Sequence, residues 1–373
     1  MLLTLIACLQ GTSDLDADED ELEDLRPGGG KIAGQSDEPI RDMGDSDIGN
    51  PGSVNRIHAE DVCKTYTLTT GKKLKAVQNL YMGVPAGQIF GLLGPNGAGK
   101  TTMISMLVGT ETVDSGDAWI CDKSIVSEEA EARASMGVCP QFDALTEALS
   151  AREMLKVFSM IRGVPDEIIP DLVENSIKQM GMVDKASQQC VNYSGGNKRK
   201  LSVALSMLAS PKVVFLDEPS TGMDPDTRRF MWDLMQKLVT QEDKAFVLTT
   251  HSMEEADALC GRIGIMTRGV MRTVGTSTEL KARHGTGFIV DLRVSDNADA
   301  DAVDDLIRSV SPNMTTEPTG LSVKKYEVPQ TDTKMGAIFA AILGAQEKLG
   351  ITDFSVSQTT LEDVFIRFAK VED

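Results

Sequence analysis

The chain has 373 residues, 41% of them hydrophobic and 25% charged, a globular composition that allows two or three domains and a sizeable core. Its formal net charge of −19 argues against a surface that binds polyanions, so we expect no nucleic-acid partner.

An acidic segment near the start of the sequence accounts for about half of this charge. Residues 14–47 hold thirteen Asp or Glu against three Lys or Arg. Residues 11–52 contain no aromatic residue and are rich in Gly and Pro, a composition that cannot repay the entropy of ordering. We therefore predict that residues 1–53 form an acidic, largely disordered linker.

The sequence shows no clear membrane-spanning segment, signal peptide or disulfide pattern. No run of about eighteen apolar residues exists, and the apolar start, residues 1–9, lacks the basic region of a signal peptide. It is either the end of a transmembrane helix or an arbitrary start. The six cysteines lie far apart, without a C-x-x-C pair or a histidine cluster, which indicates reduced thiols in a cytosolic protein.

The next elements alternate between strand and helix. β-Rich runs at residues 56–62 and 74–84 precede a short apolar strand, 88–93, which leads into a glycine loop and a helix over 101–108. Helical spacing from about 147 to 208 predicts a helical subdomain. Apolar runs at 212–217, 245–250 and 262–266 then predict buried strands of a parallel sheet covered on both faces.

The pattern changes after about Thr276. The predicted order is βαββαβ, a ferredoxin-like α+β fold, with elements at residues 287–294, 298–310, near 314, 321–328, 333–349 and 351–357. A last helix follows, with Thr359 and Glu362 placed for a capping box. We expect its apolar face to pack on the chain's own body; the face comprises Leu361, Val364, Phe365 and Phe368.

The glycine loop carries the first chemical motif. GPNGAGKTT matches G-x-x-x-x-G-K-[ST] between a strand and a helix, the context that a phosphate-binding P-loop requires. Backbone N–H groups and the helix N-terminus would hold the phosphates, Lys100 would reach the β- and γ-oxygens, and the Thr101 hydroxyl would meet Mg²⁺. The predicted ligands are ATP and Mg²⁺, and the loop residues are Gly94, Pro95, Asn96, Gly97, Ala98, Gly99, Lys100, Thr101 and Thr102.

A carboxylate pair ends the strand at 212–217. Asp-Glu after a strand is usually only a loop start, but ligands gather at the carboxyl ends of parallel strands. We therefore expect Asp217 to hold Mg²⁺ through water and Glu218 to polarise the attacking water.

The segment YSGGNKRKLS carries a third candidate site. Ser194 is placed as the N-cap of a helix, and with Gly195 and Gly196 it could also receive a γ-phosphate. The chemistry alone leaves both interpretations open.

Taken in this order, the motifs resemble the nucleotide-binding domain of an ABC transporter over about residues 56–274. The resemblance implies that Tyr66 stacks on adenine, that Gln141 belongs to the Q-loop and contacts Mg²⁺, and that His251 is the switch histidine. Ser194 to Asn197 match the signature and residues 220–224 the D-loop. The catalytic set would be Lys100, Gln141, Glu218 and His251, and the metal set Thr101, Gln141 and Asp217.

Three segments resemble subfamily A, in particular the second, C-terminal cassette of its lipid or sterol transporters. They are YSGGNKRKLS, which departs from Leu-Ser-Gly-Gly-Gln at Tyr193 and Asn197, then CPQFDAL and LEDVF. The resemblance implies a P-loop ATPase domain with a mixed sheet over residues 54–275 and a ferredoxin-like regulatory domain over 276–373.

The resemblance also implies partners. A second nucleotide-binding domain would pair head to tail, so that each ATP lies between one P-loop and the other domain's Ser194, at the cytoplasmic face of a membrane. Residues 141–154 would face transmembrane domains that carry the lipid; alternatively, Phe142 and Leu145 are buried subdomain contacts.

Two other functions fit the motifs less closely. A soluble ABC ATPase of DNA repair would carry a long coiled-coil insertion, whereas only a cassette-length segment separates Gly99 from Ser194. A translation ATPase would usually carry two cassettes, and one is visible. A non-hydrolysing nucleotide sensor would hold ATP without turning it over.

Overall fold

The structure, a computed structural model, describes residues 55–285, 287–295, 300–317, 323–329 and 331–370. The predicted linker, 1–53, lies outside them. Contacts divide the chain into a first unit, Met1–Thr276 with Phe368–Asp373, and a second unit, Ser277–Arg367. Each unit is described by itself.

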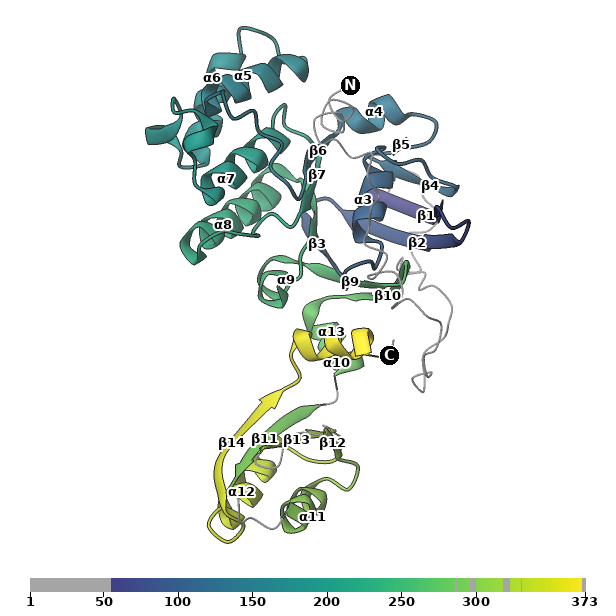
Figure 1. The fold of residues 1–373 in the computed structure, drawn as a ribbon, viewed down its shortest axis with the longest axis vertical. Coiled ribbons are helices and arrows are strands. Elements are labelled where there is room, and N and C mark those ends of the chain that lie inside the picture. The colour runs from purple at the N-terminus through teal and green to yellow at the C-terminus, as the bar shows by residue number, and fades with distance from the viewer. Residues whose placement is uncertain (1–54, 286, 296–299, 318–322, 330, 371–373) are drawn as a thin grey trace. The chain divides into compact units, whose positions relative to one another are not determined.

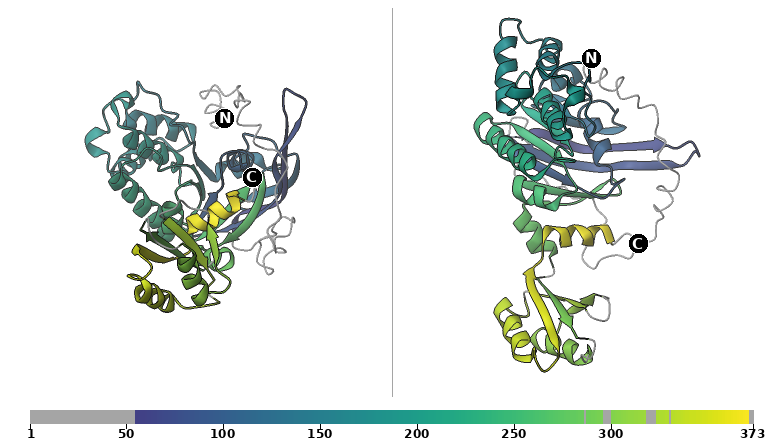
Figure 2. Two further views of the ribbon diagram at one scale, coloured as in Figure 1. Left: turned by 60° about the horizontal axis from the view of Figure 1, so that its bottom comes forward. Right: turned by 60° about the vertical axis from the view of Figure 1, so that its left-hand side comes forward.

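The first unit begins with a four-stranded antiparallel sheet in the order β2-β1-β4-β5. Its two long strands form the hairpin visible as the purple and blue ribbons in Figure 2. They cover and extend the two β-rich runs predicted at its start. The strands are β1 (Asn55–Thr67), β2 (Lys73–Pro85), β4 (Ser115–Ile120) and β5 (Lys123–Ser124).

A six-stranded mixed sheet follows, in the order β10-β9-β3-β8-β7-β6. All neighbouring pairs are parallel except β10 with β9. The first four residues of β7 and all of β8 are buried, as expected for strands covered on both faces. The strands are β3 (Gln88–Leu93), β6 (Met136–Cys139), β7 (Val213–Asp217), β8 (Ala245–Thr249), β9 (Arg262–Thr267) and β10 (Val270–Gly275).

Helix α3 (Lys100–Leu107) lies between the two sheets (Figure 1). Its buried residues, Met103, Ile104, Met106 and Leu107, join one core cluster with residues of both sheets. The glycine loop that opens α3 is therefore fixed by packing on both sides. The other helices outside the helical subdomain are α4 (Glu129–Ala134), α8 (Pro225–Glu242) and α9 (Met253–Leu259).

The segment predicted as a helical subdomain, about residues 147–208, is mainly helical in the structure. It contains α5 (Ala151–Ile161), α6 (Ile169–Gln179), two short 3₁₀ helices (Val183–Lys185 and Cys190–Asn192) and α7 (Gly195–Ser206). Ser150 and Glu153 form a capping box at α5, and Ser194 caps α7 by accepting a hydrogen bond from the Asn197 N–H. Phe142 is 75% exposed, so its interpretation as a buried subdomain contact is wrong.

The second unit has the predicted ferredoxin-like topology. Its antiparallel sheet runs β12-β13-β11-β14, and the helices come after the first and third strands of the βαββαβ order. The elements are α10 (Ser277–His284), β11 (Phe288–Val294), α11 (Ala300–Val310), β12 (Thr315–Glu317), β13 (Val323–Val328), α12 (Met335–Ala345) and β14 (Ile351–Gln358). Helix α12 is shorter at both ends than predicted.

The last helix, α13 (Leu361–Lys370), begins one residue later than the predicted capping box requires. Thr360 and Asp363 form that box instead: the Thr360 N–H donates to Asp363 Oδ2 at 2.8 Å, and the Asp363 N–H to Thr360 Oγ1 at 3.2 Å. The predicted pair, Thr359 and Glu362, is wrong because the Thr359 hydroxyl bonds Gly287. Of the predicted apolar face, Leu361, Val364 and Phe368 are buried, while Phe365 is half-buried.

No helix within the described ranges combines the length and apolar character needed to cross a bilayer. The five cysteines in these ranges are free thiols.

Candidate functional site

The first unit contains a cavity of about 480 Å³ at the carboxyl ends of β3 and β7. Eleven of the predicted site residues line it: Tyr66, Asn96, Gly97, Ala98, Gly99, Lys100, Thr101, Thr102, Gln141, Asp217 and Glu218. The mixed sheet thus brings together segments that are far apart in the sequence.

The glycine loop has the backbone that a phosphate cradle needs. Gly97 and Gly99 have φ angles of 75° and 99°, in the region that favours glycine. Gly99 is the N-cap of α3, so no side chain caps this helix, and its first turn holds no acidic residue. A helix N-terminus left open in this way is an anion-binding site.

Lys100 folds back over this loop. Its Nζ donates to the Gly94 carbonyl at 2.7 Å and to the Pro95 carbonyl at 3.0 Å. Gly94 and Pro95 are the two predicted loop residues that do not line the cavity. Burial lowers the pKa of Lys100, while the Glu218 and Asp217 carboxylates act in the opposite direction. A cation therefore stands between the cradle and two acids.

Asp217 ends β7 and is half-buried. Burial raises its pKa, the Thr249 hydroxyl that donates to Oδ1 lowers it, and the neighbouring Glu218 raises it again. A group with a raised pKa gains from a nearby cation that stabilises its charged form.

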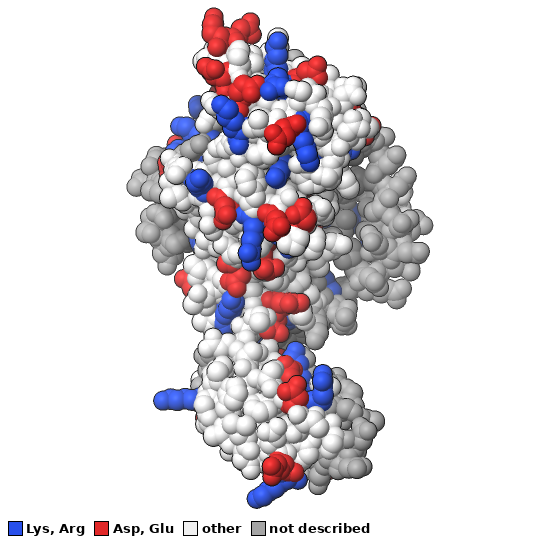
Figure 3. Space-filling view, turned by 90° about the vertical axis from the view of Figure 1, so that its left-hand side faces the viewer, with Lys and Arg blue, Asp and Glu red and all other residues white. Residues whose placement is uncertain are grey.

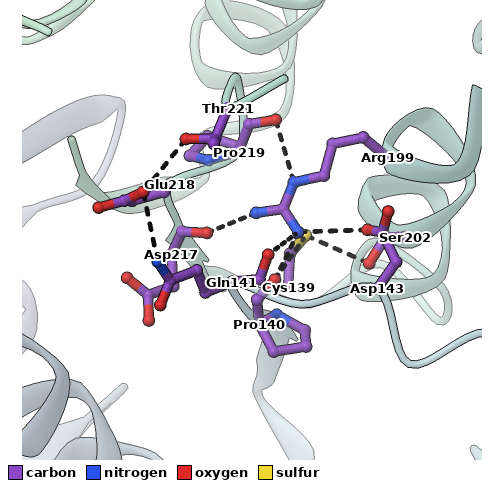
Figure 4. A network of polar contacts seen from close by, with 10 residues as sticks. All are labelled: Cys139, Pro140, Gln141, Asp143, Arg199, Ser202, Asp217, Glu218, Pro219 and Thr221. Atoms are coloured by element: carbon purple, nitrogen blue, oxygen red, sulfur yellow. Dashed lines mark hydrogen bonds and ion pairs between the residues drawn. The ribbon is translucent and has the colours of Figure 1, made fainter. Parts of the chain in front are cut away.

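Glu218 lies at the centre of a small polar network. Its φ of 47° is unusual for a residue other than glycine, and its N–H donates to the Thr249 carbonyl at 3.1 Å and to the Thr249 hydroxyl at 3.0 Å. Thr221 Oγ1 donates to Glu218 Oε2 at 3.1 Å, and Gln141 Nε2 donates to the same oxygen at 3.4 Å (Figure 4). His251 Nδ1 lies 3.3 Å from Glu218 Oε1.

Gln141 and His251 therefore converge on the carboxylate that the sequence assigned to water activation. Gln141 follows β6 and is exposed; His251 follows β8 and its side chain is 70% exposed. His251 contacts Glu218 without lining the cavity.

Tyr66 forms part of the cavity wall from the end of β1. Its half-buried phenol hydrogen-bonds the Thr102 side chain, and Lys64 Nζ lies 5.4 Å from the ring centroid. Burial raises the pKa of Tyr66, and Glu111 adds to the rise. The ring borders the cavity beside the cradle.

Ser194, Gly195 and Gly196 do not line this cavity. Ser194 and Gly195 are exposed, and Asn197 Nδ2 donates to Ser194 Oγ at 2.9 Å. The structure therefore keeps the signature serine apart from its own chain's cradle.

Sequence reasoning missed five residues of the cavity wall. They are Leu74, Lys75, Ala76, Gln78 and Arg268. Gln78 donates to the Arg268 carbonyl at 2.9 Å, which joins β2 to the turn between β9 and β10. No motif marks them, since they reach the cavity only through the pairing of distant strands.

The donor set suits Mg²⁺ in its chemistry. Thr101, Gln141 and Asp217 offer oxygen donors, and Mg²⁺ commonly binds one or two protein oxygens together with waters and substrate phosphates. Within the described ranges, no group of three His, Cys, Asp or Glu could hold a metal ion by itself. The residues fit a cation that binds together with a phosphate ligand.

Two protein families match parts of the chain. The family described as "ABC transporter" matches residues 77–221, and "ABCA1-like, C-terminal R1 regulatory domain" matches residues 285–358. The first range holds the glycine loop and the carboxylate pair, and the second lies in the ferredoxin-like unit.

Similar whole proteins are far longer than this chain. Mouse "Phospholipid-transporting ATPase ABCA3" is 41% identical over 302 residues, which is 80% of this chain and 18% of that protein. Human "Retinal-specific phospholipid-transporting ATPase ABCA4" is 40% identical over 354 residues, 91% of this chain and 15% of that protein. "ABC transporter A family member 9" of Arabidopsis thaliana is 40% identical, covering 86% of this chain and 35% of that protein.

Solved structures share the fold of the first unit. A dimeric ATP-binding cassette in a post-hydrolysis state with ADP and phosphate matches with a TM-score of 0.55 and 20% identity, over 59% of this chain and 98% of its own. CbiO1 of Clostridium perfringens, part of an ABC transporter complex, matches with a TM-score of 0.56 and 22% identity, over 62% of this chain and 92% of its own. At these identities the likeness speaks for the fold.

Proposed function

Because the chain belongs to the ABC transporter family, in its subfamily A, we propose that it is an ATP-hydrolysing cassette that powers lipid movement across a membrane. The observation that carries this proposal is the single cavity wall that unites the phosphate cradle, Lys100 and the Asp217–Glu218 pair.

Different residues of the cavity bind the phosphates, the adenine and the metal ion. The N–H groups of the glycine loop and of the α3 N-terminus receive the β- and γ-phosphates, and Lys100 turns from the Gly94 and Pro95 carbonyls toward them. The Tyr66 ring stacks on the adenine. Thr101, Gln141 and Asp217 would hold Mg²⁺, which would supply positive charge against the phosphates.

Glu218 acts on the attacking water. It accepts the proton as the water oxygen forms a bond to the γ-phosphorus and the bond from that phosphorus to the β-phosphate oxygen breaks, releasing ADP and phosphate. Gln141 and His251, at 3.4 and 3.3 Å from its two carboxylate oxygens, orient the carboxylate.

The signature serine serves a second cassette. Ser194 lies outside its own chain's cavity and opens α7. In the head-to-tail pair that we propose, it donates to the γ-phosphate bound by the partner. Its oxygen already accepts hydrogen bonds from the N–H and Nδ2 of Asn197, which leaves its proton for that phosphate.

The proposed context is a larger transporter. The mouse and human relatives described above are named phospholipid-transporting ATPases, and the chain spans only 18% and 15% of them. We propose that this cassette works with transmembrane domains, at the cytoplasmic face of the membrane, and that lipid contacts only those domains.

The Glu218→Gln variant of the full chain tests this function. The amide keeps the size of the side chain but cannot take a proton, so we expect turnover of Mg-ATP to fall by about 10² to 10⁴-fold. ATP binding, followed by fluorescence of a labelled nucleotide, should stay within about threefold of wild type because the cradle is unchanged.

Glu254→Gln is the matched control, since Glu254 is exposed in the first turn of α9 and lies outside the cavity wall. It should keep wild-type turnover. Equal turnover in the Glu218→Gln and wild-type chains would show that Glu218 does not activate water. ATP binding without turnover in the wild type would favour a nucleotide sensor.

A further inference from the structure

Arg199 is a buried cation that the proposed chemistry does not use. It lies in α7, five positions after the cap Ser194, and only 3% of the residue is exposed. Its guanidinium reaches two separate segments that border the cavity: residues 140–143, which contain Gln141, and residues 217–219, which contain Glu218 (Figure 4).

The first set of contacts fixes the Gln141 segment. Arg199 Nη1 donates to the Pro140 carbonyl at 2.5 Å and the Gln141 carbonyl at 3.1 Å, and it lies 3.3 Å from Asp143 Oδ1. These partners are consecutive or nearly so, and the guanidinium therefore holds the backbone on which the Gln141 side chain stands.

The second set fixes the Glu218 segment. Arg199 Nε donates to the Pro219 carbonyl at 3.1 Å, and Nη2 donates to the Asp217 carbonyl. The two acceptors flank Glu218 on either side. The backbone at Glu218 is also the one with the unusual φ of 47°, so these bonds help to hold a conformation that costs free energy.

The chemistry of arginine explains why one side chain can serve both segments. A guanidinium presents five N–H donors in a rigid plane, whereas a lysine ammonium is a single point of charge. With both edges of the plane engaged, the spacing between the two segments is set by the group itself. The direct bond between the Gln141 and Glu218 side chains is long, at 3.4 Å, and one of its partners is exposed.

We propose that Arg199 is a positioning residue that clamps the Gln141 and Glu218 segments together and ties both to the helix that begins at Ser194. This deepens the proposed function and rests on it for the roles of Gln141, Glu218 and Ser194. A shift of α7 on engagement of Ser194 would reach the water-activating carboxylate through the Arg199 guanidinium.

Hydrogen exchange of the full chain tests the clamp without relying on hydrolysis. The reporters are the amides of Leu145, which donates to the Asp143 carbonyl, and of Thr221, which donates to the Glu218 carbonyl. In Arg199→Gln we expect exchange in both segments to rise by roughly tenfold or more, because charge-assisted bonds to both are lost together. Strand β8 should keep its wild-type exchange.

Arg199→Lys separates charge from geometry. It keeps the positive charge but cannot reach both segments, so it should loosen at least one of them and lower turnover by about tenfold or more. The KM for ATP should change little in either variant, since Arg199 does not line the cavity. Lys198→Gln is the control: this neighbour in α7 lies 3.7 Å from the exposed Glu147 and should behave as wild type.

Several results would overturn the proposal. Exchange that rises only within α7, or throughout the first unit, would indicate ordinary packing. Wild-type exchange and turnover in Arg199→Lys would show that two-sided geometry is not needed. If the wild-type chain hydrolyses no ATP, the proposed function fails, while the exchange of the two segments still decides whether Arg199 clamps them.

Discussion

Gly97 and Gly99 both have φ angles in the left-handed region, yet a side chain would meet different surroundings at each. A Cβ at Gly99 would lie 2.2 Å from the Ala76 carbonyl oxygen, whereas at Gly97 no described heavy atom lies within 4 Å. At Gly99, glycine is needed both for its left-handed φ and to avoid the Ala76 oxygen; at Gly97 it is needed only for its φ.

We expect Gly99→Ala to lower the free energy of unfolding of the first unit by about 3 kcal/mol, from backbone strain and overlap together. Gly97→Ala, the matched control, should cost about 1 kcal/mol from strain alone. Tryptophan fluorescence in urea reports on this unit, since Trp119 and Trp232 both lie in it. Equal losses in the two variants would contradict the close approach to Ala76.

Sequence motifs predicted those site residues that lie next to one another in the chain. The glycine loop and the carboxylate pair follow strands, so their position at a sheet edge could be predicted from periodicity. Arg268 and Ala76 could not, because they join the cavity wall through strand pairings that carry no residue signature. The sequence also did not indicate that Arg199 would bridge two of the motifs.

At the scale of elements, the start of α13 distinguishes two neighbouring acids. Asp363 makes the capping box with Thr360, while Glu362 is exposed in the same first turn. Asp363→Ala should therefore lower the unfolding free energy by about 1 kcal/mol, and Glu362→Ala by less than about 0.5 kcal/mol. Hydrogen exchange of the α13 amides measures both, and the reverse order would restore the capping box predicted from sequence.

Most long elements could be predicted because their apolar periods are strong, as in β7 and β8. Boundaries were less certain. The predicted start of α13 was one residue too early. Two Thr and two acids stand next to each other in the sequence, and only the hydrogen bond between Thr359 and Gly287 decides which pair forms the capping box. The short β5 and α4 carry too few residues for a periodic pattern.

The stability of the second unit should depend on pH through the Asp304 carboxylate, which accepts a hydrogen bond from a buried tyrosine. Tyr326 is fully buried, and its hydroxyl and Lys324 Nζ both donate to Asp304 Oδ1 at 2.6 Å. Burial acts to raise the pKa of Asp304, but these two bonds outweigh it, with a smaller effect from Arg308, and the net pKa is lowered. The resulting stability is present above the unfolded pKa of about 3.9 and is lost as the pH falls through the lower, folded value.

We predict that Asp304→Asn speeds exchange of the β13 amides relative to wild type at pH 6, and that the ratio falls toward one as the pH drops below the unfolded pKa of about 3.9 and through the lower, folded pKa of Asp304. Comparing the two chains at each pH cancels the intrinsic exchange rates. Asp305→Asn, at a neighbouring side chain that is 75% exposed, should give a ratio near one throughout. A ratio for Asp304→Asn that does not change with pH would rule out this coupling.

At the scale of the molecule, charge does not mark a binding patch on the face shown in Figure 3. Figure 3 shows Lys, Arg, Asp and Glu side chains interspersed over the face that lies at the left of Figure 1. Half of the net negative charge instead lies in residues 14–47 of the sequence. The surface in this view thus mixes charges of both signs and offers no charged patch for a partner.

At the scale of the whole molecule, the segment around Ser194 lies apart from the cavity. Ser194, Gly195 and Gly196 belong to α7 and its cap and do not border the cradle of their own chain. If they complete a nucleotide site, they do so for another cassette. Turnover by this chain on its own should then depend on how often two copies meet.

The most direct test of the account is the rate of phosphate release from Mg-ATP by the full chain as a function of protein concentration, beside Glu218→Gln. We expect turnover per chain to rise with concentration if, as proposed, each site is completed by Ser194 of a second cassette, and to be nearly absent in Glu218→Gln at every concentration. Turnover that Glu218→Gln leaves intact, or no turnover at any concentration while ATP still binds, would contradict the claim that this cavity hydrolyses ATP through Glu218.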